Sequence, residues 1–146
     1  MKKIFIYYSL TGNGDVIANY LKEKNYEIRK VETIDKLPKS KFLQILIGGY
    51  RTIINYKDNL TKFNYNIDNY DEVIIGSPIW NDRISSPINS LLDKINLNNK
   101  KVTFIFYSGS GKEKHASELI NSIYPKAKII ELKEPKKNII ELDKIK

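Results

Sequence analysis

Short apolar runs recur along the chain and predict five β-strands. Each run is rich in isoleucine, valine, phenylalanine or tyrosine, the residue types that strands favour. The runs cover residues 3–8, 26–31, 72–77, 102–107 and 127–132. The first, third and fourth are nearly continuous in apolar residues, which is typical of strands covered on both faces of a parallel sheet. The second is mixed with charged residues, as expected of an edge strand, and the last is expected at the other edge.

Between these runs, apolar residues recur at helical spacing. Ile88, Leu91, Leu92 and Ile95 lie at i, i+3, i+4 and i+7, which places them on one helix face. Comparable patterns predict helices over residues 14–24, 41–54, 85–95, 112–124 and 138–146, with a break expected at Gly48-Gly49. Asn138 and Glu141 form a plausible capping pair for the last helix. Residues 55–70 are polar and rich in asparagine, and are expected to form a surface connection.

The regular alternation of strands and helices indicates an α/β fold with helices on both faces of a parallel sheet. Right-handed crossovers leave few topologies for such a chain. Five strands suit a doubly wound parallel sheet in the order 2-1-3-4-5, whose ligand crevice lies outside the carboxyl ends of strands one and three. With 146 residues and no visible linker or repeat, the chain is expected to form a single domain over residues 1–146.

The loop after the first strand carries residues suited to binding an anion. Ser9, Thr11, Gly12, Asn13 and Gly14 supply two hydroxyls, two glycines and an amide just before a predicted helix. Such a turn directs backbone N–H groups and the positive end of the helix dipole at a negatively charged group. The same residues would equally suit an ordinary capped turn. No Gly-Lys-Ser/Thr sequence follows and no G-x-G-x-x-G is present, so the loop is neither a Walker loop nor a dinucleotide fingerprint.

Two further loops are expected at the same edge of the sheet. Residues 76–83 follow the third strand and contain Trp80, the only tryptophan, whose ring would suit a flat aromatic ligand or would simply cover the end of the core. Residues 107–112 follow the fourth strand and alternate glycine with serine, which suits either backbone contacts to a ligand or a plain turn. Together the three loops match a mononucleotide whose base is a large planar heterocycle.

Composition removes several classes of function. The chain has no cysteine and one histidine, His115, so disulfides, thiolate metal sites and multi-histidine metal sites are excluded. The net charge of +8 suggests an anionic partner, but no dense basic block with interleaved aromatic residues indicates nucleic-acid binding. No apolar stretch approaches the roughly 20 residues of a membrane span. We therefore expect a cytoplasmic protein that binds neither nucleic acid nor membrane.

Several segments resemble the flavodoxin family. Residues 4–13, Ile-Phe-Ile-Tyr-Tyr-Ser-Leu-Thr-Gly-Asn, are similar to its opening strand and phosphate loop. Residues 70–80, Tyr-Asp-Glu-Val-Ile-Ile-Gly-Ser-Pro-Ile-Trp, resemble its second block, and residues 87–92 resemble the Pro-x-x-x-Phe/Leu-Leu run after it. Residues 41–56, with Gly48-Gly49, resemble a helix of a small bacterial flavodoxin-like subgroup. The resemblance implies a flavodoxin-like fold and one non-covalently bound FMN that transfers electrons.

By position, the resemblance also implies which residues contact FMN. The phosphate loop and the two later loops supply them, and no catalytic residue or metal ligand is implied. The implied cofactor-binding residues are Ser9, Leu10, Thr11, Gly12, Asn13, Gly14, Pro78, Ile79, Trp80, Asn81, Tyr107, Ser108, Gly109 and Gly111.

The sequence departs from the family in two ways. Gly14 stands where the phosphate loop usually ends in threonine, so one hydroxyl donor is absent, and the chain is basic where electron-carrying flavodoxins are typically acidic. We expect an acidic redox partner protein and a monomer or weak dimer. An electron carrier is favoured over a stand-alone FMN-dependent oxidoreductase. The alternatives are an interaction module without FMN, and a ribonucleotide reductase-activating flavodoxin-like protein, against which the Gly-Ser-Pro-Ile-Trp block argues.

Overall fold

A computed structural model describes residues 1–35, 37–53 and 56–146. Strands and helices alternate along the chain as the apolar pattern predicts. The elements are β1 (Lys3–Tyr7), α1 (Asn13–Lys22), β2 (Glu27–Lys30), α2 (Lys41–Ile53), β3 (Glu72–Trp80), β4 (Arg83–Ile84), α3 (Ser86–Leu92), β5 (Lys101–Ser108), α4 (His115–Ile123), β6 (Lys128–Lys133) and the 3-10 helix η1 (Ile139–Ile145). No helix in the described ranges has the length and apolar character needed to cross a membrane.

The sheet contains the five predicted parallel strands and one short addition. Its order is β2-β1-β3-β5-β6, and β4 pairs antiparallel with β3 off this path. The predicted order 2-1-3-4-5 therefore holds for the parallel strands but omits β4, which arises because the chain turns back on itself after Trp80. The central strands β1, β3 and β5 are almost entirely buried, whereas the edge strands β2 and β6 are partly exposed.

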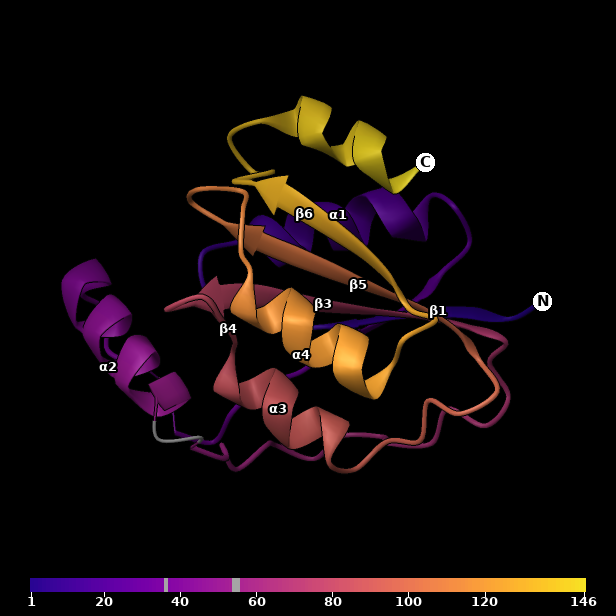
Figure 1. Ribbon diagram of the computed structural model, residues 1–146, viewed down its shortest axis with the longest axis horizontal. Coiled ribbons are helices and arrows are strands. Elements are labelled where there is room, and N and C mark those ends of the chain that lie inside the picture. Colours follow the sequence, from indigo (N-terminus) through magenta and orange to yellow (C-terminus); the bar gives the residue numbers. More distant parts are fainter. Residues whose placement is uncertain (36, 54–55) are drawn as a thin grey trace.

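Helices cover both faces of the sheet and create two separate cores (Figure 1). On one face, α1 and η1 pack on a cluster that includes Phe5, Tyr7 and Tyr107. On the other, α3 and α4 pack on a cluster that includes Phe104 and Phe106. Helix α2 stands apart beside the carboxyl end of β3 (Figure 1). The carboxyl edge of the sheet is thus the place where loops from several strands and α2 come together.

Some predicted boundaries were wrong. Helices α3 and α4 are shorter than the patterns over 85–95 and 112–124 indicated: α3 ends at Leu92, and α4 begins only at His115, where Asp82 accepts the amides of Lys114 and His115. The C-terminal segment is a 3-10 helix, and its expected capping pair does not form, since Glu141 Oε2 instead accepts the amide of Lys133 at 2.8 Å. Helix α2 runs through Gly48-Gly49 without a break. Residues 54 and 55, at the ends of two predicted segments, lie outside the described residues.

Candidate functional site

The loop between β1 and α1 is organised around the hydroxyl of Ser9. Ser9 Oγ accepts the amides of Gly12 at 3.2 Å and Gly14 at 3.0 Å. Gly12 adopts a φ of +93°, which glycine reaches without the steric cost that a side chain brings. Because Ser9 Oγ already accepts two hydrogen bonds, its own hydroxyl hydrogen is free to point out of the loop as a donor.

The open end of helix α1 leaves backbone donors available. Within the residues that the structure describes, the amides of Thr11, Asn13 and Asp15 donate to no protein acceptor. The first amides of any helix lack intrahelical partners, and the aligned peptide dipoles make this end positive. The loop can therefore supply several N–H groups, with a positive potential, to an anion such as a phosphate.

Gly14 is required by packing rather than by loop conformation. A Cβ atom built on it would lie 2.6 Å from Tyr7 Cδ2 and 2.7 Å from the Tyr107 hydroxyl. The Tyr107 hydroxyl donates to the carbonyl of Tyr8, so it is held in that place. The threonine of the family pattern cannot be accommodated here, and its absence does not indicate an eroded loop.

A carboxylate lies beside this loop but is neutralised by neighbours. Asp15 Oδ1 accepts hydrogen bonds from Lys30 Nζ at 2.7 Å and from the Tyr7 hydroxyl at 2.8 Å. Partial burial works against the charge, but these two donors hold the pKa of the Asp15 carboxyl below its usual value. Burial, followed by the hydrogen bond to Asp15, raises the pKa of Tyr7. The carboxylate is thus already paired and opposes an incoming anion only weakly.

The second predicted loop is a continuation of β3 into a tight hairpin. Pro78, Ile79 and Trp80 belong to the strand, and Asn81 and Asp82 make the turn with φ values of +50° and +59°. Two consecutive residues with positive φ are typical of the two-residue turn that joins twisted antiparallel strands. At the base of the hairpin, Ser77 Oγ accepts the amide of Ser85 at 3.1 Å, so the hairpin is anchored in the core.

Trp80 packs between a helix and a strand end. A Cβ on Gly48 of α2 would lie 3.1 Å from Trp80 Cδ2, so the helix backbone approaches the indole closely. Tyr8 meets the indole edge-on, with ring centroids 5.8 Å apart. Trp80 remains partly exposed. The ring therefore lies at the carboxyl edge of the sheet, with α2 covering part of it.

Asp82 attaches the hairpin to the start of α4, the helix that follows the third loop. Its Oδ1 accepts the amide of Lys114 at 2.8 Å and its Oδ2 that of His115 at 3.2 Å, while its carbonyl accepts the amide of Ala116. An acidic group at a helix N-terminus satisfies free donors and complements the dipole. Asp82 was missed by the sequence reading, because it caps α4 from another part of the chain; the Asn-Asp dipeptide of the turn was the only local signal.

The third loop lies beside this hairpin but presents mainly backbone. Ser108 Oγ accepts the amide of Gly111 at 2.9 Å, which closes a small turn in which Gly111 has a φ of +68°. Gly109 has nothing within 4 Å of a Cβ position and faces open space. Tyr107 is not accessible to a ligand in this structure, because it is 2% exposed and is enclosed beneath α1. Within this loop, residues 108–111 are thus the accessible part of the predicted set.

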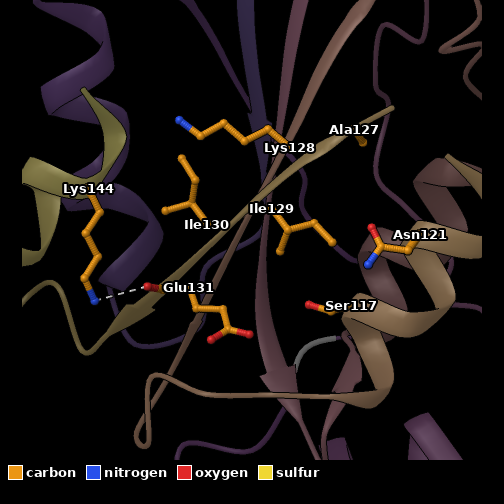
Figure 2. A pocket seen from close by; sticks show the side chains of 8 residues that line it. All are labelled: Ser117, Asn121, Ala127, Lys128, Ile129, Ile130, Glu131 and Lys144. Carbon is orange, nitrogen blue, oxygen red and sulfur yellow. Dashed lines mark hydrogen bonds between the residues drawn. The ribbon is translucent and has the colours of Figure 1, made fainter. Parts of the chain in front are cut away.

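Cavities do not all coincide with the loops. A cavity of about 220 Å³ lies beside the first loop, lined in part by Ser9, Leu10 and Lys30. A larger, open hollow of about 560 Å³ follows the outer edge of β6 between α4 and η1 (Figure 2), where Lys144 Nζ donates to the Glu131 carbonyl at 3.4 Å. The larger hollow contains none of the predicted site residues. The first cavity therefore marks the side of the molecule where the candidate site lies.

The donors at the carboxyl edge fit the parts of FMN. Free amides and a hydroxyl at the α1 terminus suit a phosphate, whereas an indole and the backbone of the third loop suit a planar ring. Because Gly14 has no side chain, the start of α1 can pack closely on Tyr7 and Tyr107, which brings the free amides of the loop to the end of β1. Nothing in the described part of the chain gathers three or more histidine, aspartate or glutamate side chains into a metal site.

Comparisons with known proteins identify the family and the fold of the chain. The sequence profile of the NADPH-dependent FMN reductase family matches residues 1–136. No curated protein matches the chain. Among solved structures, a flavoprotein from Lactobacillus acidophilus NCFM in complex with FMN is 23% identical, with 95% of this chain and 97% of that chain covered and a TM-score of 0.68.

Two other structures are similar over most of their length. A provisionally assigned flavoprotein from Bacteroides eggerthii is 21% identical, with 97% and 96% of the two chains covered and a TM-score of 0.72. The apo form of the flavoprotein from Lactobacillus acidophilus NCFM is 25% identical, with 89% of each chain covered and a TM-score of 0.59. These similarities support a flavodoxin-like fold, and on the match to residues 1–136 the chain belongs to the NADPH-dependent FMN reductase family.

Proposed function

We propose that the protein binds one FMN without a covalent bond and uses it to transfer electrons to a partner protein. The observation that carries the proposal is the meeting of two unlike surfaces at one sheet edge. The free amides of Thr11, Asn13 and Asp15 lie at the end of β1, and the partly exposed indole of Trp80 lies at the end of the adjacent β3. Membership of an FMN reductase family supports the identity of the cofactor.

The residues of the chain would position FMN at both of its ends. The α1 terminus and the Ser9 hydroxyl would hold the phosphate, and the Trp80 hairpin and residues 108–111 would hold the ring. The capping of α4 by Asp82 attaches the hairpin to the helix that follows residues 108–111. When bound, FMN supplies the one-electron and two-electron chemistry, while the protein supplies binding, orientation and electrostatics.

The basic character of the chain supports docking to an acidic redox protein. With a net charge of +8, long-range attraction would accelerate encounter with a negatively charged partner and weaken as salt screens it. A second candidate function is a reductase that takes electrons directly from NADPH, which the family match favours. The two candidates share the FMN site and differ in the electron donor.

The size of the chain supports membership of the small bacterial flavodoxin-like subgroup. The flavoproteins from Bacteroides eggerthii and Lactobacillus acidophilus are each covered over more than nine tenths of their length, so little lies outside the shared unit. We infer that the chain acts as one flavodoxin-like domain. The helix that resembles this subgroup, α2, is also the one whose Gly48 contacts Trp80.

An FMN titration of the apo protein followed by tryptophan fluorescence tests the proposal. Because Trp80 is the only tryptophan, ring stacking should quench the emission strongly and saturate at one FMN per chain. Absence of binding would overturn the proposal and favour an interaction module. Binding with unchanged emission would remove Trp80 from the site. Anaerobic addition of NADPH to the loaded protein then separates the two candidates, since only a reductase loses its flavin absorbance without a partner.

A further inference from the structure

A lysine from the far end of the chain lies across the phosphate loop. Lys136 follows β6, and its Nζ donates to the carbonyl of Thr11 at 3.2 Å. Its backbone amide donates to Asn13 Oδ1 at 3.1 Å. The side chain runs directly over Gly12, where a Cβ would lie 3.1 Å from Lys136 Nζ and 3.2 Å from its Cδ. Two independent contacts thus fix this residue on the loop.

The ammonium group of Lys136 has no direct carboxylate partner in the described ranges, although its charge helps to lower the pKa of the Asp15 carboxyl, which is already hydrogen-bonded to Lys30. The ammonium group lies at the N-terminus of α1, the positive end of the helix dipole, where a cation is repelled. By contrast, the adjacent Lys137 pairs with Glu134 at 2.7 Å. The acceptor of Lys136 Nζ is a neutral carbonyl, which leaves two of its three N–H donors for another group.

The segment that carries Lys136 also contacts the third loop. The amide of Glu134 donates to the carbonyl of Ser108 at 3.0 Å. Pro135, between the two contacts, is buried. The turn after β6 therefore spans from Ser108 to Asn13, and it holds the lysine over the helix terminus at a fixed place rather than on a loose tail.

We infer that Lys136 supplies the positive charge that binds the phosphate monoester of FMN, and that it makes the protein select FMN over riboflavin. The inference rests on the proposed function, since it assigns a residue to the phosphate end of that site. An ammonium group pairs with a phosphate through charge-assisted hydrogen bonds, which are stronger than those from neutral amides. It also compensates for the hydroxyl that Gly14 cannot provide.

The test compares two ligands and two lysine variants. Titrations of FMN and riboflavin, followed by Trp80 fluorescence and by calorimetry, are carried out on the wild type, Lys136→Met and Lys137→Met at low salt. Methionine keeps much of the length and apolar character of the lysine stem. We expect Lys136→Met to weaken FMN binding roughly tenfold and to leave riboflavin binding unchanged, while Lys137→Met changes neither. Lys136→Arg should restore most of the FMN affinity.

Salt gives a second readout. The affinity of the wild type for FMN should fall as salt is raised, and that of Lys136→Met should fall less steeply, because one charge pair is missing. Equal weakening of both ligands in Lys136→Met would assign the residue a structural role and overturn the inference, as would unchanged FMN affinity. If the wild type binds riboflavin and FMN equally well, the inference fails while the flavin site stands. If it binds neither, the proposed function itself fails.

Discussion

A Cβ atom on Gly14 would lie 2.7 Å from the hydroxyl of Tyr107, a residue more than 90 positions away in the sequence. Tyr107 cannot yield easily, because its ring is buried and its hydroxyl donates to the Tyr8 carbonyl. The end of helix α1 is therefore placed on the sheet by a contact that only glycine permits. The missing threonine of the phosphate loop follows from this contact.

Restoring the family's threonine should consequently harm the protein. We expect Gly14→Thr to lower the free energy of unfolding by about 1–3 kcal/mol, as overpacking of a close contact does, and to weaken FMN binding because α1 moves away from the strand end. Urea denaturation and FMN titration measure the two effects. Gly109→Ala is the control for the urea denaturation alone, since nothing lies within 4 Å of its Cβ position. A stable Gly14→Thr variant with tighter FMN binding would contradict the assignment.

The link between Asp82 and α4 should control how firmly the Trp80 hairpin is held against the helix. Asp82→Ala removes the acceptors for the amides of Lys114 and His115. We expect a loss of about 1 kcal/mol in the free energy of unfolding, typical of a helix cap, together with weaker FMN binding. Asp93→Ala, which breaks only an exposed pair with Lys57, serves as the control. If both variants bind FMN as the wild type does, Asp82 does not position the site.

The absence of a side chain at Gly48 of α2 should be necessary for the observed position of the Trp80 indole. We expect Gly48→Leu to displace Trp80, shift its fluorescence emission to longer wavelength and weaken FMN binding, because a Cβ there already lies 3.1 Å from the ring. Gly49→Ala offers a neighbouring control, with Asn81 Cβ 3.9 Å away. Because alanine has a higher helix propensity than glycine, Gly49→Ala should stabilise α2 by up to about 1 kcal/mol. Identical emission spectra of Gly48→Leu and the wild type would refute the contact.

The sequence predicted the parallel sheet well, because each central strand is buried on both faces and must be apolar throughout. Runs such as residues 102–107 carry this signal without help from distant residues. The hairpin after β3 was missed, since the apolar residues Ile79 and Trp80 continue the strand and the turn depends on the positive φ of Asn81 and Asp82. A local hydrophobic pattern therefore predicts which residues are buried better than it predicts where the chain reverses direction.

The candidate site was predictable only in part, for a similar reason. The three loops were placed at one edge by topology alone, which needs no side-chain contacts. The contacts that position the site join residues far apart in the sequence. Asp82 caps α4, Gly48 packs against Trp80, and Lys136 Nζ donates a hydrogen bond to the carbonyl of Thr11. None of these pairs is close in sequence, so periodicity and motif spacing could not reveal them.

The buried carboxylate Asp58 provides a prediction about pH. Asp58 Oδ1 pairs with Arg51 Nη1 at 2.7 Å, and its Oδ2 accepts the Ser86 hydroxyl, so it joins α2 to α3. Burial outweighs these partners and raises the pKa of the Asp58 carboxyl above its usual value. The folded state therefore binds this proton more tightly than the unfolded state does. Its contribution to stability is complete below the unfolded pKa and is lost as pH rises through the folded pKa.

Asparagine at this position removes the titration while keeping the shape. We expect the free energy of unfolding of Asp58→Asn, relative to the wild type, to rise between about pH 4 and neutral pH. Asp15 has the opposite shift, because hydrogen bonds from Lys30 and Tyr7 outweigh partial burial and hold its pKa low. Asp15→Asn should therefore lose stability relative to the wild type as pH rises toward about 4, below the range in which Asp58 acts. Urea denaturation at half-unit pH steps measures both curves, and parallel slopes for the two variants would show that burial does not govern Asp58.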